Sequence, residues 1–306
     1  MTHRRGATVL AILLAAAAAL SLLHVLAARP GPVIRAQSRP LEVLPELPEL
    51  SAAHLAALPE ARYDAVIAAL LPAEGPAEAD TAYRLRKDTA LYAADRTTPV
   101  ARLAARNFLG EPSVVVPVER SGDWLRVLTP ARQRLPSADI NSAGTNSADT
   151  NSAGTGPTGT NSPGVLAPAQ TSAWLRADSL SSPTILVNRI IVSVSAQTLS
   201  IIGVGSRTWP VGVGAPGTPT PIGVTGYLEA RYRDAAQGQA EHPVQLSSLH
   251  STPADEPFGG NDGGLIRIHF QASASGAVSH GCIRVPIEAI AAVNALPLGT
   301  LITTEE

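Results

Sequence analysis

The clearest pattern of apolar and polar positions lies in the last third of the chain. In ILVNRIIVSVSAQTLSIIGVG, Ile190 and Val192 alternate with other positions, and Leu199 and Ile201 resume the alternation after SAQ. A period of two places successive side chains on opposite faces of a strand, so this stretch predicts a β-hairpin. Residues 233–262 show no such period and are predicted to form a long irregular loop.

A second alternating stretch is LIRIHF, at residues 265–270. Its apolar side carries Ile266, Ile268 and Phe270, and its other side carries Leu265, Arg267 and His269. The apolar side belongs in a core, so His269 is predicted to point the opposite way, at a strand end beside glycine-rich loops. IRV then predicts a short strand, PIEAIAAVNAL a helix beginning at Pro286, and PLGTLITT a last strand after a turn at Gly299.

The first half of the chain shows shorter elements. Residues 51–71 have apolar positions at near-helical spacing after Ser51, which predicts one or two small amphipathic helices. SVVVPVER and DWLRVLT predict two strands joined by SGD. A tract at 137–171 with a five-residue repeat has no apolar face and is predicted to be disordered. AWLRADSL resumes the strand pattern, and it and DWLRVLT resemble the last strands of a bacterial SH3-like domain. That resemblance implies that Trp124 and Trp174 lie on adjacent strands, with the tract as their connecting loop.

Composition narrows the class of protein. The 306 residues are 45% hydrophobic, with 25 Gly and 26 Pro, which favours two mainly β domains joined by turns and linkers. The net charge is -2 and basic residues form no stripe, so a nucleic-acid partner is not expected. A basic start precedes an apolar run, so residues 1–28 are predicted to be a signal peptide or, if uncleaved, a membrane anchor. Residues 29–80 form a Pro-rich spacer with short helices.

Cys282 is the only cysteine in the chain. An unpaired cysteine in an exported protein is either a buried inert residue or a reactive thiol. A thiol attacks only as the thiolate, and with an ordinary pKa of about 8.5 it needs a neighbouring base. Two imidazoles are candidates, His269 from the adjacent strand and His280 two positions before the thiol.

A metal site is a rival interpretation of the same residues. The spacing of the histidines, Cys282 and the nearby aspartates matches no regular zinc pattern, so no metal or other cofactor is expected; the residues concerned are His242, His250, Asp255, Asp262, His269, His280 and Cys282.

The motifs resemble the L,D-transpeptidase catalytic domain, also called YkuD. The matching residues are the strand that ends at His269 and the run Ser279-His280-Gly281-Cys282-Ile283-Arg284. GTPTPIG at 217–223 and SAQTLSII are similar to two further segments of that family, and the resemblance covers about residues 185–304. It implies a mainly β fold at 183–306, a YkuD-type β-sandwich with a short helix after the cysteine motif. Residues 81–180, interrupted by the tract, resemble a bacterial SH3-like β-barrel domain.

The resemblance also implies an activity and roles for the motif residues. The expected function is a cysteine-dependent L,D-transpeptidase that acts on peptidoglycan stem peptides through a thioester, with Cys282 as nucleophile, His269 as general base and His280 in a supporting role. Backbone N–H groups near Gly281 and Cys282 would stabilise the oxyanion. Ser279 is expected to cap the turn beside the substrate, and Arg284 to pair with a stem carboxylate.

Two alternatives stay open at this point: a non-catalytic cell-wall-binding protein and an L,D-carboxypeptidase. The acyl acceptor, which separates cross-linking from exchange and hydrolysis, is not legible in the sequence. The expected location is extracytoplasmic, with the protein either secreted to the cell wall or anchored by residues 1–28.

Overall fold

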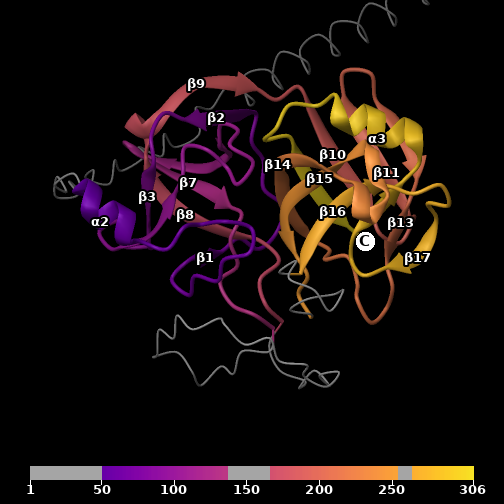
Figure 1. The fold of residues 1–306 in the computed structure, drawn as a ribbon, viewed down its shortest axis with the longest axis horizontal. Coiled ribbons are helices and arrows are strands. Elements are labelled where there is room, and N and C mark those ends of the chain that lie inside the picture. Colours follow the sequence, from indigo (N-terminus) through magenta and orange to yellow (C-terminus); the bar gives the residue numbers. More distant parts are fainter. Residues whose placement is uncertain (1–49, 137–165, 254–263) are drawn as a thin grey trace, which may run out of the picture. The chain divides into compact units, whose positions relative to one another are not determined.

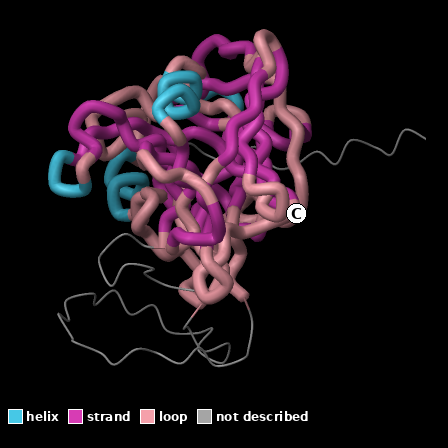
Figure 2. Tube along the Cα trace, turned by 90° about the vertical axis from the view of Figure 1, so that its right-hand side faces the viewer, coloured by secondary structure: helices cyan, strands magenta, loops and turns pink. Residues whose placement is uncertain are grey.

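The computed structural model describes residues 50–136, 166–253 and 264–306. The predicted export segment at 1–28 and most of the low-complexity tract lie outside these ranges. Within them, no helix combines the length and the apolar character needed to cross a membrane. The described chain is mainly β, as predicted, and its few helices are short (Figures 1 and 2).

Residues 50–185 form what we call the amino-terminal module. Its helix is α2 (Ala52–Ala57), and its strands are β1 (Leu71–Pro72), β2 (Thr81–Leu85), β3 (Thr89–Tyr92), β4 (Pro99–Leu103), β5 (Val114–Val115), β6 (Pro117–Ser121), β7 (Trp124–Thr129), β8 (Thr171–Arg176) and β9 (Leu180–Ile185). One sheet has the order β4-β3-β8-β7-β6 with β1 beside β8, and a second has the order β5-β2-β9. Buried aliphatic side chains from both sheets form a common core.

The strands that flank the low-complexity tract pair with each other. Trp124 lies opposite Arg176, and Arg126 lies opposite Trp174, in an antiparallel β7–β8 ladder. The prediction that the two tryptophans occupy adjacent strands is therefore confirmed. The SH3-like identity of this module stays a prediction.

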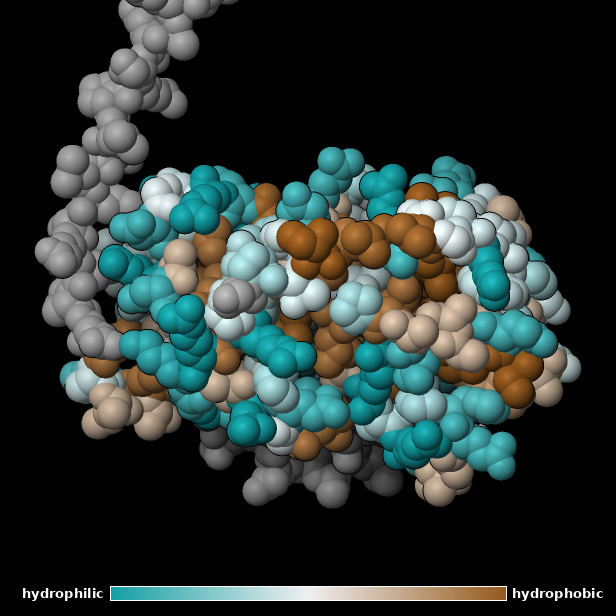
Figure 3. Space-filling view, turned by 90° about the horizontal axis from the view of Figure 1, so that it is seen from above, coloured by the Kyte–Doolittle hydropathy of each residue, from teal (hydrophilic) through white to brown (hydrophobic). Residues whose placement is uncertain are grey.

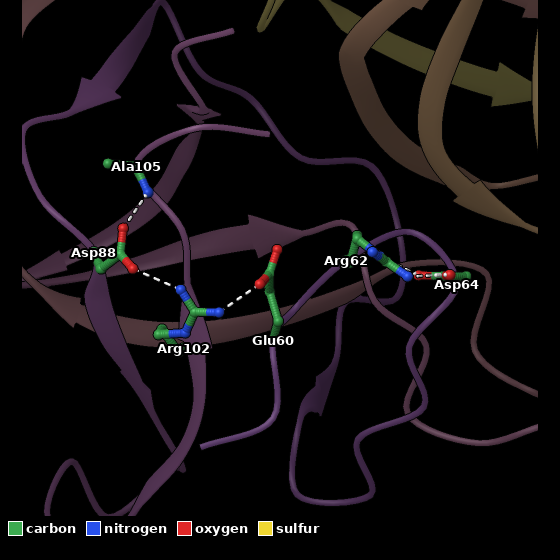
Figure 4. A network of polar contacts seen from close by, with 6 residues as sticks. All are labelled: Glu60, Arg62, Asp64, Asp88, Arg102 and Ala105. Atoms are coloured by element: carbon green, nitrogen blue, oxygen red, sulfur yellow. Dashed lines mark hydrogen bonds and ion pairs between the residues drawn. The ribbon is translucent and has the colours of Figure 1, made fainter. Parts of the chain in front are cut away.

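Of the one or two small helices expected within residues 51–71, the structure has one. The chain forms only α2, which Ser51 caps by accepting a hydrogen bond from the His54 N–H at 3.2 Å. After Pro59 it continues as turns and irregular chain, with isolated bridges such as Glu60 to Arg102, whose side chains also form an ion pair (Figure 4). Pro59 has no N–H to continue a helical ladder. The buried side chain of Ile67 then packs against the strands of the module.

Residues 188–305 form the carboxy-terminal module. Its strands are β10 (Asn188–Ser193), β11 (Thr198–Gly203), β12 (Arg207–Pro210), β13 (Gly212–Gly214), β14 (Val224–Asp234), β15 (Gln239–His250), β16 (Leu265–Phe270), β17 (Gly276–Ser279), β18 (Ile283–Val285) and β19 (Leu301–Glu305), and its helix is α3 (Ile287–Asn294). The ten strands follow the order β12-β11-β10-β19-β14-β15-β16-β18-β13-β17. The strands and the helix predicted around Pro286 and Gly299 are confirmed.

The main core of this module lies on one face of its sheet. Ile190, Val192, Ile266 and Ile268 are fully buried there, and Ile290 of α3 packs into the same cluster. Exposed large apolar side chains are scattered over the outside, and Figure 3 shows apolar surface (brown) broken up by hydrophilic side chains (teal).

The irregular loop predicted at 233–262 is partly wrong. Its first part is the end of β14 and the whole of β15, a long antiparallel hairpin turned at Gly238, while residues 254–263 lie outside the described ranges. The period of two failed to reveal this hairpin because β14 and β15 are buried on both faces over the part away from the turn and are mostly exposed or half-buried near it. A bulge beside Glu229 also breaks the register.

Buried apolar side chains from both modules form the contact between them. Tyr227 and Leu301, which lie opposite each other on β14 and β19, pack against Ala82, Val116 and Leu128 of the amino-terminal module. Gly299 belongs to this contact, because a Cβ there would lie 2.5 Å from the Cβ of Ala82.

Candidate functional site

Strand pairing brings Cys282, His269 and Arg284 onto one face of the sheet. β16 and β18 are parallel, with Ile268 beside Ile283 and His269 beside Arg284. The same register, continued by one residue, brings Cys282 beside Arg267. Alternation then turns these polar side chains away from the buried Ile268 and Ile283, as the sequence predicted for His269.

The thiol of Cys282 lies in a buried but polar setting. The side chain is 2% exposed, and its Sγ donates a hydrogen bond to the Leu265 carbonyl oxygen at 3.7 Å. Since a thiolate has no proton to donate, this contact belongs to the neutral thiol. Ionisation therefore requires a base that takes the proton from this position.

The hydrogen bonding and the charge state of the His269 ring suit such a base. Its Nδ1–H donates to the Phe270 carbonyl oxygen at 3.2 Å, which leaves Nε2 as the nitrogen that accepts a proton. Burial lowers the pKa of His269 below its ordinary value of 6.5; the Phe270 hydrogen bond opposes this, and the charges of Arg284 and Arg267 lower the pKa further. The ring is therefore neutral at neutral pH.

The turn that carries the thiol is held by the hydroxyl of Ser279. Its Oγ accepts the Gly281 N–H at 3.1 Å and donates to the Cys282 carbonyl oxygen at 2.5 Å. The side chain is buried, so it caps the turn as the sequence analysis expected. The Gly281 N–H predicted near the oxyanion is thus already engaged by Ser279.

Two threonines of the GTPTPIG segment clamp the same turn, a role that the sequence reasoning missed. Thr218 donates from Oγ1 to the Ser279 carbonyl at 3.1 Å. Thr220 donates to the Gly281 carbonyl at 2.8 Å and accepts the Gly214 N–H at 2.9 Å. Threonine hydroxyls at alternate positions of a Pro-stiffened segment were the available sequence signal. The segment therefore fixes the position of the cysteine turn.

Gly281 itself is required by its backbone. Its φ is +108°, and a Cβ there would lie 2.8 Å from Cδ1 of Ile266. This conformation turns the chain between His280 and Cys282. Their side chains therefore do not share a face, as residues i and i+2 of one strand would. His280 is exposed while Cys282 is buried.

Arg284 offers an unsatisfied donor on the same face. Among the described residues its buried Nε has no hydrogen-bond partner, and its side chain is half-buried. A buried guanidinium nitrogen without an acceptor is a site at which an incoming carboxylate or carbonyl gains a charge-assisted hydrogen bond.

Of the residues in the rival zinc interpretation, Asp255 and Asp262 lie outside the described ranges. The described ranges contain no group of three or more His, Cys, Asp or Glu side chains arranged to hold a metal ion. Of the histidines in the rival zinc interpretation, His250 is buried and donates from Nε2 to the Tyr63 carbonyl oxygen at 2.9 Å.

Comparisons with known proteins assign this region. Residues 187–303 match the family model of the L,D-transpeptidase catalytic domain, YkuD. A comparison with curated proteins finds no match.

Several solved structures resemble the chain at low identity. An L,D-transpeptidase from Mycobacterium tuberculosis H37Rv is 15% identical over 80% of this chain and 100% of its own, with a TM-score of 0.33. L,D-transpeptidase 1 of M. tuberculosis is 20% identical over 44% and 78%, with a TM-score of 0.28. A mutant of the Enterococcus faecium L,D-transpeptidase is 22% identical over 38% and 49%, with a TM-score of 0.27. The assignment therefore rests on the family match over residues 187–303.

Proposed function

Because residues 187–303 are a YkuD-type L,D-transpeptidase catalytic domain, we propose that the protein is a cysteine-dependent L,D-transpeptidase that acts on peptidoglycan stem peptides through a thioester. The observation that carries this proposal is the placement of Cys282 and the neutral His269 on adjacent strands, on the face opposite the core.

The first half-reaction begins at the thiol. Nε2 of His269 takes the proton of Cys282, and the sulfur attacks the carbonyl carbon of an L,D-peptide bond in the stem. The resulting oxyanion collapses, the C–N bond breaks, and the protonated His269 gives its proton to the departing amine of D-alanine. The acyl group remains on sulfur as a thioester.

The second half-reaction regenerates the thiol. The amine of another stem attacks the thioester, His269 accepts its proton, and the C–S bond breaks as the new amide forms. The sulfur leaves as thiolate and recovers a proton from the imidazolium. The same two residues thus act in both directions of acyl transfer.

Supporting residues have separable roles in this proposal. Ser279, Thr218 and Thr220 hold the turn so that the sulfur and the Cys282 N–H keep a fixed relation to the reacting carbonyl. Arg284 pairs with a stem carboxylate through its unsatisfied Nε, while its charge keeps His269 in the basic form. His280 lies outside the buried part of the site and supports the turn from the solvent side.

The experiment that tests the proposal is turnover of soluble muropeptides, with products separated by mass. The wild-type protein should release D-alanine and form a cross-linked dimer, and alkylation of Cys282 or the substitution Cys282→Ala should abolish both. Full activity after alkylation would refute the thioester mechanism.

The same products decide between the alternatives. Release of D-alanine without a dimer or an exchanged product would identify an L,D-carboxypeptidase. Binding to cell-wall sacculi with no product of any kind would identify a non-catalytic wall-binding protein. The proposal places the protein outside the cytoplasm, where its substrate lies.

A further inference from the structure

The carbonyl group that orients the His269 ring has a second donor. The Phe270 carbonyl oxygen accepts the Nδ1–H of His269 at 3.2 Å and also an N–H of the Gln239 side-chain amide, whose Nε2 lies 3.1 Å away. A carbonyl oxygen has two lone pairs, so it can accept both hydrogen bonds. Gln239 is the first residue of β15 and is 31 positions from Phe270 in the chain.

The backbone of the sheet leaves this carbonyl available. The N–H of the same peptide group belongs to Gln271 and donates to the Val285 carbonyl oxygen at 2.9 Å, on the β18 side. In a trans peptide the C=O and the N–H point in opposite directions, so the Phe270 carbonyl faces β15. The β15–β16 register, continued by two residues beyond Ile268, places Pro243 opposite Phe270. Proline has no N–H, so the ladder supplies no donor there.

Two carbonyl groups set the orientation of the Gln239 amide. The side chain is buried, with 7% of its surface exposed, and Nε2 also donates to the Gln237 carbonyl oxygen at 3.5 Å. Turning the amide over would bring Oε1, which can only accept, against both carbonyl oxygens. The amide nitrogen of Gln239 therefore faces Phe270.

This orientation leaves the other half of the amide unsatisfied. Among the described residues, the buried Oε1 of Gln239 has no hydrogen-bond partner. A buried acceptor without a donor is unfavourable for folding, and an apolar side chain of the same length would avoid this cost. The Phe270 carbonyl would still have the His269 ring as its donor. Folding stability alone therefore does not favour glutamine over methionine here, whereas the contact with Phe270 gives the amide a role beside the base.

The tip of the β14–β15 hairpin holds Gln239 in place. The preceding turn, η3 (Ala235–Gln237), is capped by Asp234, whose carboxylate accepts the last N–H of that turn at 3.2 Å. Further along β15, the ring of His242 meets the ring of Phe270 edge to face, with centroids 4.8 Å apart. The hairpin tip thus contacts the end of β16 through a ring as well as through the amide.

We propose that Gln239 is a positioning residue for the general base. By donating to the Phe270 carbonyl from the β15 side, its amide holds the peptide group at the end of β16 from the side opposite Val285. The carbonyl then keeps its direction toward the imidazole, so the ring proton stays on Nδ1 and Nε2 is free to accept the proton of Cys282. This inference rests on the proposed function, because it takes His269 as the base.

The first test identifies the protonated nitrogen of His269. In protein labelled with 15N-histidine, long-range 1H–15N correlation spectra at neutral pH distinguish the two neutral tautomers, and the signals lost in His269→Gln assign the ring. In wild type the ring should carry its proton on Nδ1. In Gln239→Met the Phe270 carbonyl is held from one side only, so the form with the proton on Nε2 should become populated.

Turnover of soluble muropeptides gives the second test. A ring with its proton on Nε2 cannot accept the proton of Cys282, so kcat of Gln239→Met should fall about tenfold. Gln239 contacts no substrate in this proposal, so KM should stay within about twofold of wild type. Gln237→Met is the matched control, because it removes an exposed amide from the same hairpin tip; its tautomer and kcat should equal those of wild type.

The thermal transition separates positioning from folding. Gln239→Met removes an unpaired buried acceptor together with one hydrogen bond, so its melting temperature should stay within a few degrees of wild type. If this variant does not fold, Gln239→Leu takes its place, because leucine also has no donor.

Three results would overturn the inference: a wild-type His269 ring with its proton on Nε2, an unchanged tautomer or kcat in Gln239→Met, or an equal effect of Gln237→Met. The tautomer is measured without substrate. Failure of the proposed function is therefore recognised separately, as an absence of muropeptide products from the wild-type protein.

Discussion

Glu229→Gln should remove much of the pH dependence of folding stability. Glu229 lies in the β14 bulge, is 9% exposed, and within the described residues its Oε2 has no hydrogen-bond partner. It lines a small pocket, partly open to solvent, together with residues such as Arg62 and Phe108. Burial raises its pKa to about 8, and the negative charge of Asp64 adds to the effect.

The size of the effect follows from the two states of the chain. In the unfolded chain the carboxyl titrates near its ordinary value of 4.5, and in the folded protein at about 8. At 1.36 kcal/mol for each pKa unit, the difference is on the order of 5 kcal/mol. Between these values the folded state binds more protons than the unfolded state. Its stabilising contribution is therefore complete below pH 4.5 and falls as the pH rises to about 8.

The assay is urea unfolding at pH 5 and pH 8.5, with the free energy of unfolding measured for wild type, Glu229→Gln and Glu241→Gln. Glutamine is uncharged at both values, so Glu229→Gln should lose several kcal/mol less than wild type over this interval. Glu241 is exposed, and its variant should follow wild type. If wild type and Glu229→Gln lost the same free energy, the interpretation of Glu229 as a buried neutral acid would be refuted.

Two further predictions concern the site. Thr220→Val keeps the shape of the side chain but removes both hydrogen bonds of its hydroxyl, which leaves the Gly281 carbonyl and the Gly214 N–H unpaired. The free energy of unfolding measured by chemical denaturation should fall by about 1–3 kcal/mol and kcat should also fall, whereas unchanged values for both would contradict the clamp. Arg284→Gln removes a charge that lowers the pKa of His269, so the acid limb of the kcat/KM profile should move to higher pH, and KM for the stem should rise. A pH profile identical to that of wild type would argue against His269 as the base.

The sequence predicted those parts of the fold that depend on local alternation. The face of the strand that carries Ile266 and Ile268 packs in the core, and His269 lies on the opposite face. On a strand with one apolar face, strict alternation allows only this orientation. The β14–β15 hairpin was not predicted because both of its faces are buried over the part away from the turn. A strand that is buried on both faces and contains polar residues shows no alternation of apolar and polar positions, so its sequence resembles that of a loop.

The candidate site was predictable to the extent that its residues are close in sequence or share one strand pair. Ser279, Gly281 and Cys282 form one turn, and His269 is brought to them by a single parallel ladder. Thr220 was missed as a functional residue because its contact with the Gly281 carbonyl spans 61 positions in the chain. Pairings over such distances depend on tertiary structure and leave no local pattern.

The β7–β8 ladder affects the order in which the amino-terminal module folds. Thr129 and Thr171, hydrogen-bonded neighbours on these strands, are 42 positions apart. During synthesis from the amino terminus, β1, β3 and β7 therefore wait for their partner β8, which emerges only after the whole intervening tract. Until β8 arrives, the edge of β7 is a place where a folding chaperone or a stray strand can attach.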